Sequence, residues 1–135
     1  MTKKTPTAYT YAFGRRKSSI ATVKLFLGKQ ESQINNQSSV KYFPDLLSQN
    51  DLNEPFILTS NPEKYYFLAK IVGGGKKGQK DALVLAISRA LRKIDQQYTP
   101  LLRSKGLLTV DSRVRQRRQV GTGGKARRQK QSPKR

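Results

Sequence analysis

The chain has 135 residues, of which 28 are Lys or Arg and 8 are Asp or Glu, so its net charge is +20. It contains no cysteine and no histidine, which excludes disulfides, thiolate metal sites and the commonest general base. No apolar run approaches the ~20 residues that cross a bilayer and no signal sequence opens the chain, so we expect a protein that stays in the compartment of its synthesis. The like charges of such a basic globule repel one another and destabilise its compact state. Binding to a polyanionic partner usually offsets this repulsion.

A basic cluster formed by Arg15, Arg16 and Lys17 precedes the first predicted strand, residues 20–27. That strand is rich in β-branched and aromatic residues, and its alternate positions form one face. The members of this face are Ala21, Val23, Leu25 and Leu27. Three consecutive cations repel one another unless an anion is near, so we interpret the cluster as a phosphate contact. The alternative is a charged strand end that prevents edge pairing.

The middle of the chain alternates short elements with connections. Residues 33–35 can pair back as a short second strand, and residues 38–47 form a helical turn that Pro44 interrupts. The apolar anchors of this turn are Val40, Tyr42, Phe43, Leu46 and Leu47. Its aromatic side chains could stack on bases, but their crowding with the two leucines favours packing in the core. Residues 49–61, rich in Asn, Asp and Ser and containing a proline, are predicted to be a connection. The strongest strand pattern covers residues 65–72.

A glycine-rich loop, residues 73–78, follows that strand and leads into a helix. The order of strand, glycine loop and helix is that of a P-loop, but Gln79 and Lys80 stand where Lys and Ser or Thr are required, so a nucleotidase is excluded. Glycines, backbone N–H groups at a helix start and the adjacent Lys76 and Lys77 suit a nucleic-acid phosphate. The alternative is a flexible turn that only closes strand onto helix.

Two helices are predicted after the loop. The first covers residues 79–94, and its apolar positions recur at steps of three and four. These positions are Leu83, Ile87, Ala90, Leu91 and Ile94. The second helix is shorter, has Pro100 in its first turn and ends at Gly106 as its C-cap.

Residues 113–135 form a basic tail with ten cations, no acid and only three apolar side chains. A segment with so little apolar surface cannot offset the entropy of ordering, so we expect it to be disordered alone in water and ordered by a polyanion. A tail that only aids solubility is the alternative, but acidic residues would serve that purpose better. The predicted organisation is therefore a globular domain, residues 1–112, followed by an extended tail, residues 113–135.

From residue 14 to residue 135 the chain resembles a universal family, the ninth ribosomal protein of the small subunit, in its bacterial-type form. The matching segments lie in the order of the family across nearly the full length. They are Gly14-Arg15-Arg16-Lys17-Ser18, Ile34-Asn35, Tyr42-Phe43, Gly73-Gly74-Gly75-Lys76, Gly78-Gln79, Ser88-Arg89-Ala90-Leu91, Gly106-Leu107-Leu108-Thr109, Asp111, Arg113, Lys125-Ala126-Arg127-Arg128 and Lys134-Arg135. Each segment alone is weak, whereas the ordered set is highly specific.

The resemblance implies an α+β fold of the ribosomal S-five-domain-two type, with a four-stranded sheet backed by helices and a long basic C-terminal tail. It implies no enzymatic activity, no cofactor and no metal. The implied partners are small-subunit ribosomal RNA in the head, the transfer RNA in the peptidyl site and neighbouring head proteins, without a membrane and without homo-oligomers. The implied location is the small ribosomal subunit in a bacterial cytoplasm or a plastid stroma.

Binding residues are carried over from the family by position. Those implied to bind ribosomal RNA are Arg15, Arg16, Lys17, Lys76, Lys77, Arg113, Arg115, Arg117, Arg118, Lys125, Arg127 and Arg128. The terminal pair, Lys134 and Arg135, would reach the anticodon arm of the transfer RNA. An arginine suits this place because its planar fork matches a pair of phosphate oxygens.

Two other classes of function share part of this pattern. An enzyme acting on nucleic acid or nucleotide would need paired acids or a nucleophile with its base, but the eight acids are scattered singly. An architectural binder of duplex DNA would share the charge but not the ordered family segments.

Overall fold

The computed structural model describes residues 9–121, 123 and 124. Predictions for residues 1–8, 122 and 125–135, which include Lys125, Arg127, Arg128, Lys134 and Arg135, lie outside the described residues. The elements follow one another as β1 (Tyr9–Arg16), β2 (Ser19–Leu27), β3 (Gln33–Ile34), β4 (Gln37–Ser38), α1 (Ser39–Tyr42), α2 (Leu46–Leu58), β5 (Tyr65–Val72), α3 (Lys76–Ile94) and α4 (Tyr98–Ser104).

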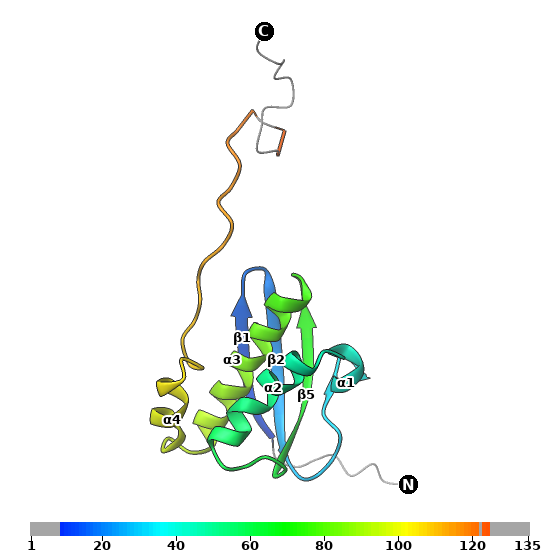
Figure 1. Cartoon of the computed structure of the whole chain (residues 1–135), viewed down its shortest axis with the longest axis vertical. Coiled ribbons are helices and arrows are strands. Elements are labelled where there is room, and N and C mark those ends of the chain that lie inside the picture. The colour runs from blue at the N-terminus through cyan, green and yellow to red at the C-terminus, as the bar shows by residue number, and fades with distance from the viewer. Residues whose placement is uncertain (1–8, 122, 125–135) are drawn as a thin grey trace.

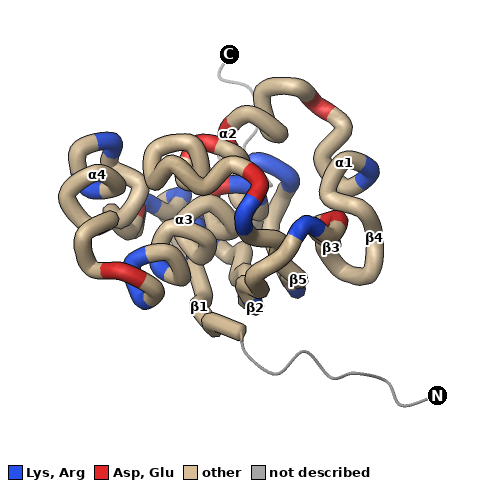
Figure 2. Tube along the Cα trace, turned by 90° about the horizontal axis from the view of Figure 1, so that it is seen from below, with Lys and Arg blue, Asp and Glu red and all other residues tan. Residues whose placement is uncertain are grey.

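The sheet has five strands in the order β1-β2-β5-β3-β4, so the expected α+β class is confirmed and the expected four strands are corrected. All neighbouring strands are antiparallel except β3 and β5, which are parallel. The helices lie on one side of the sheet (Figure 2). The prediction that residues 33–35 pair back onto the preceding strand is wrong, because β3 pairs with β4 and β5 instead.

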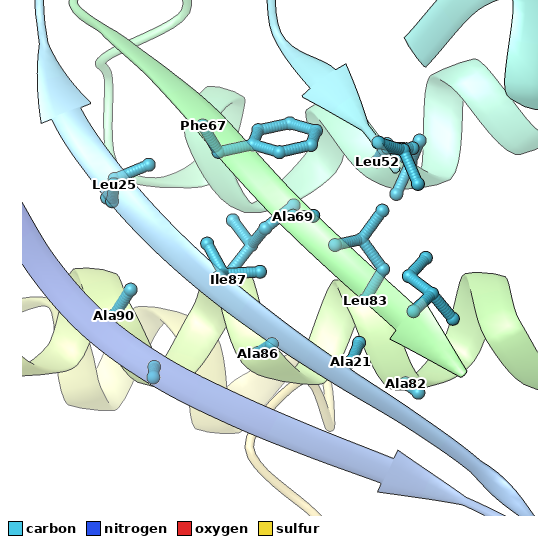
Figure 3. Close-up of a cluster of buried hydrophobic side chains, with 14 of the residues drawn as sticks. Ala21, Leu25, Leu52, Phe67, Ala69, Ala82, Leu83, Ala86, Ile87 and Ala90 are labelled. Carbon is cyan, nitrogen blue, oxygen red and sulfur yellow. The ribbon is translucent and has the colours of Figure 1, made fainter. Parts of the chain in front are cut away.

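The core lies between α3 and the sheet (Figure 3). Alternate residues of β2 and β5 point into it, as the period of two in the sequence predicts. Ala82, Ala86 and Ala90 recur at steps of four on α3 and are fully buried. These small side chains let α3 lie close to β1, while the neighbouring Leu83 and Ile87 fill the wider space over β5. Burial of Leu83 and of Ile87 each stabilises the fold by about 1.5–3 kcal/mol.

Several predictions about the ends and faces of elements need correction. Leu27, the last residue of β2, is 68% exposed, and Ile94 lies at the exposed end of α3. Three of the apolar side chains of residues 38–47 are exposed, whereas Phe43 is buried. The exposed ones are Val40, Leu46 and Leu47. Residues 49–61 are not a connection, since α2 covers most of them and buries Leu52 and Phe56 against the core.

The second predicted helix is confirmed as α4, with Pro100 in its first turn. Gly106 has φ +70°, its N–H donates to Arg103 O, and Leu107 N–H donates to Leu102 O. This is a Schellman motif, which ends the helix at the predicted glycine. In the described part of the chain, no helix is long and apolar enough to cross a membrane.

Candidate nucleic-acid interface

The basic cluster at residues 15–17 lies at the tip of the β1–β2 hairpin (Figure 1). Arg15 and Arg16 belong to β1, which the sequence analysis did not predict as a strand, and Lys17 begins the turn with φ 54°. Successive strand residues point to opposite faces, so Arg15 is exposed and Arg16 turns toward α3. Lys17 is also exposed, which leaves Arg15 and Lys17 accessible to an anion.

Arg16 connects the hairpin to α3 and to the start of the tail. Its Nη1 donates to Arg113 O at 2.6 Å, and its Nη2 lies 3.5 Å from Asp111 Oδ2. Its Nε lies 3.9 Å from Asp81 Oδ2, and only 13% of the side chain is exposed. The guanidinium therefore serves an internal contact before any ligand binds. Sequence reasoning missed this contact because Arg16 and Arg113 are 97 residues apart.

The glycine loop packs directly against the same hairpin. Gly73 and Gly74 have φ +77° and +66°, and Ser19 Oγ donates to Gly73 O at 3.1 Å. A Cβ on Gly73 would lie 2.5 Å from Ser18 O, so the close approach for which glycine is required here is to the protein's own backbone. The fold thus brings the two predicted basic groups, residues 15–17 and residues 76–77, to one end of the sheet (Figure 1).

Helix α3 begins at Lys76, three residues before the predicted start, with Gly75 as its N-cap. Among residues 9–121, no side-chain hydrogen bond caps its first turn, where backbone N–H groups lack helical partners. Lys76 Nζ donates to Tyr42 O at 3.1 Å and lies 3.6 Å from the centre of the Tyr42 ring. Lys77 is exposed. One predicted lysine therefore holds α1 against the loop, and the other faces solvent.

Acidic side chains partly neutralise the cations at the end of the sheet where residues 15–17 and residues 76–77 meet. Lys80 Nζ lies 2.7 Å from Asp51 Oδ2, and this hydrogen bond raises the pKa of the lysine. Asp111 accepts from Nε, Nη2 and the backbone N–H of Arg113. The hydrogen bond to the Arg113 side chain is the main reason that the pKa of Asp111 is well below its usual range. Among the described residues, no group of three acids could hold a metal ion.

Residues 109–119 have neither helix nor strand, and the segment leaves the globule beside β1 (Figure 1). The Arg113 side chain is 84% exposed although it pairs with Asp111. Arg115 and Arg117 are exposed, and Arg118 is half-buried. From Arg113 onward the sequence contains no Asp or Glu, so no acidic side chain follows these arginines along the chain.

Fold and surface define a small basic α+β protein with three groups of cations at one end of its sheet. Comparison with known proteins identifies the family to which this basic α+β protein belongs. A family model described as ribosomal protein S9/S16 matches residues 14–135. The chain belongs to this ribosomal protein family, which is not a family of enzymes, and the predicted resemblance is confirmed.

Curated relatives cover most of the chain. The small ribosomal subunit protein uS9 of Ureaplasma urealyticum is 44% identical over 122 residues, which are 90% of this chain and 91% of that protein. The protein of the same name in Methylacidiphilum infernorum is 43% identical over 84% of this chain and 83% of its own length. The Rickettsia conorii protein is 41% identical over 93% of this chain and 78% of its own length.

Proposed function

We propose that this protein is a structural component of the small ribosomal subunit, where it binds ribosomal RNA in the head. The observation that carries the proposal is the family match over residues 14–135, which includes the basic tail. The convergence of residues 15–17, residues 76–77 and Arg113 at one end of the sheet supports it, because phosphate contacts give most of the affinity for nucleic acid.

The cations have different tasks in this proposal. Arg15, Lys17 and Lys77 bind phosphates directly, since they are exposed. Arg16 and Lys76 hold the tail and the glycine loop in place, and their remaining donors reach RNA from those positions. The tail beyond residue 112 forms a separate extended unit, whose RNA contacts come from Arg113, Arg115, Arg117, Arg118, Lys125, Arg127 and Arg128.

Binding to RNA is tested with the purified chain. The chain should bind a transcript of the small-subunit head more tightly than it binds random duplex DNA of the same length. The chain should also co-sediment with small subunits. Equal affinity for both nucleic acids would favour an architectural polyanion binder. Absence from the small-subunit fraction would contradict the proposal.

The terminal pair, Lys134 and Arg135, contacts the anticodon arm of the transfer RNA in the peptidyl site. Deletion of Arg135 should leave assembly unchanged, because many other contacts hold the protein, and should weaken retention of the transfer RNA. An assembly defect as severe as that caused by loss of the whole tail would contradict this assignment.

Neighbouring head proteins complete the set of partners. The protein does not form homo-oligomers, and its compartment is the bacterial cytoplasm or the plastid stroma.

A further inference from the structure

A second basic region, absent from the sequence analysis, lies where the last turns of α3 pass the free edge of β1. An open hollow of about 610 Å³ is found there. It is lined by Ala12, Phe13, Arg89, Arg92, Lys93 and Gln96. Three of the six are cations and none is acidic, and the Phe13 side chain is 53% exposed. The hollow therefore combines an accessible aromatic ring with positive charge that no lining carboxylate neutralises.

The Phe13 ring belongs to a row of three aromatic side chains at alternate positions of β1, each about half exposed. Such positions share one face of a strand and lie about 7 Å apart. Every ring has a cation from another element beside it. The pairs are Tyr9 with Lys24 at 5.2 Å, Tyr11 with Lys93 at 5.9 Å and Phe13 with Arg89 at 5.4 Å, measured from the cation to the ring centre.

Two of these cations also have a structural task. Arg89 Nη1 donates to Phe13 O at 2.9 Å, and Lys93 Nζ donates to Tyr11 O at 2.6 Å. Both carbonyls lie on the unpaired edge of the sheet, so the two side chains protect that edge. Each bond uses one donor, whereas a guanidinium carries five N–H donors and an ammonium three.

Arg92 has no such task. It is exposed, and within residues 9–121 its side chain has no hydrogen-bond or ion-pair partner. Edge protection therefore explains Arg89 and Lys93 but not the third cation of the hollow. The three cations and the Phe13 ring line the same hollow, and the unused donors of these cations favour an anionic ligand with a flat apolar face.

We propose that this hollow binds an unpaired segment of RNA, with a base stacked on Phe13 and a phosphate held by Arg89, Arg92 and Lys93. Unpaired bases are commonly recognised by stacking on aromatic rings, and neighbouring cations neutralise the backbone. The proposal rests on the proposed function, since small-subunit ribosomal RNA is the RNA meant. A neighbouring protein would have to present carboxylates to the same cations, and it is the competing occupant.

The test measures binding of the full chain to a fluorescent oligouridylate of about ten nucleotides, within the range of known single-strand sites. Phe13→Leu removes the ring but keeps an apolar side chain, and it should weaken affinity about 5- to 100-fold without changing the salt slope. Phe13→Tyr should restore affinity. Arg92→Gln should weaken binding and lower the salt slope by about 0.7. Lys29→Gln removes the same charge from an exposed turn outside the hollow and should change affinity less than twofold.

Unfolding midpoints close to that of the original chain should accompany all four variants, because Phe13, Arg92 and Lys29 are exposed. Equal oligouridylate affinity in all variants, with intact binding of the head transcript, would overturn the hollow but not the proposed function. Failure of the unmodified chain to bind the head transcript would instead overturn the proposed function. In assembled subunits, crosslinks from residue 13 to RNA would support the site, and crosslinks only to a protein would overturn it.

Discussion

Arg15 and Arg16 are chemically identical neighbours with different environments. The alternation of β1 leaves Arg15 in solvent and turns Arg16 toward Asp81 and toward Asp111 and Arg113 at the start of the tail. Arg16 is therefore a positioning residue for the segment that leaves the globule. Its position in the sequence suggested only phosphate binding, because the partners come from α3 and from residues 111–113.

Arg16→Gln should release the start of the tail. We expect a loss of about 1 kcal/mol in the free energy of unfolding, since Asp81 and Asp111 are 39% and 33% exposed and water screens the pairs. Urea unfolding measures this loss, and amide chemical shifts of residues 109–114 should change. Arg15→Gln removes the same charge from an exposed site and should change stability by less than about 0.5 kcal/mol. Equal effects of the two substitutions would contradict the positioning role.

From the pairing of Asp111 with Arg113 we predict that the stability of the start of the tail depends on pH. The hydrogen bond from the Arg113 side chain lowers the pKa of Asp111, so the folded pKa lies below the unfolded value of about 3.9. The contact between Asp111 and Arg113 therefore stabilises the start of the tail above about pH 4 and is lost as the pH falls through the lowered pKa. A ¹³C titration of the Asp111 carboxyl should show this, and Arg113→Gln should raise the pKa toward its ordinary value. An unchanged titration in that variant would be inconsistent with the pairing.

At the scale of elements, α3 lies close to β1 because both present small residues where they meet. Gly14 is buried, and a Cβ on it would lie 2.7 Å from Ala86 N and would also clash with Ala82 O. Its φ is not positive, so glycine is needed for space and not for backbone conformation. The alanines on α3 provide the same space from the other side.

Gly14→Ala should therefore destabilise the protein by about 1–3 kcal/mol, because α3 must move away from the sheet. Gly75→Ala is the matched control, since a Cβ there would meet nothing within 4 Å and the N-cap φ of −95° suits alanine. We expect the control to change stability by about 0.5 kcal/mol or less. Thermal unfolding compares the two, and an equally mild effect of Gly14→Ala would show that the contact between α3 and β1 can relax.

Helix α2 shows where local pattern and tertiary packing disagree. Pro55 lies inside it, and proline removes a helical hydrogen bond, which is why residues 49–61 resembled a connection. Burial of Leu52 and Phe56 on the core outweighs that local cost. Thr59 Oγ1 donates to Pro55 O and Phe56 O, which satisfies carbonyls at the end of the helix.

For the molecule as a whole, positive charge predicts strong salt dependence. If roughly six to ten phosphates are neutralised, affinity for the head transcript should fall about 10³–10⁵-fold between 50 and 200 mM salt. Removal of residues 113–135 takes away ten of the 28 cations and should make the salt slope shallower. Titrations of the full and shortened chains measure both slopes. A nearly flat titration, or identical slopes, would contradict a tail that contacts RNA.

Local sequence was sufficient for the elements whose signals repeat within a few residues. The strands near residues 20–27 and 65–72, the long helix and the glycine that ends α4 follow from periodicity and capping, because each depends on neighbours along the chain. Charge and composition pointed to a polyanionic partner in the same way.

Only the tertiary structure decided which distant groups meet. It joined Arg16 to Arg113, packed the glycine loop on the β1–β2 hairpin and placed Arg89 and Lys93 beside the β1 rings. These contacts depend on strand order and on the closeness of α3 to β1, which small buried side chains allow. No periodic pattern encodes such pairs, because their energies arise between segments that only folding brings together.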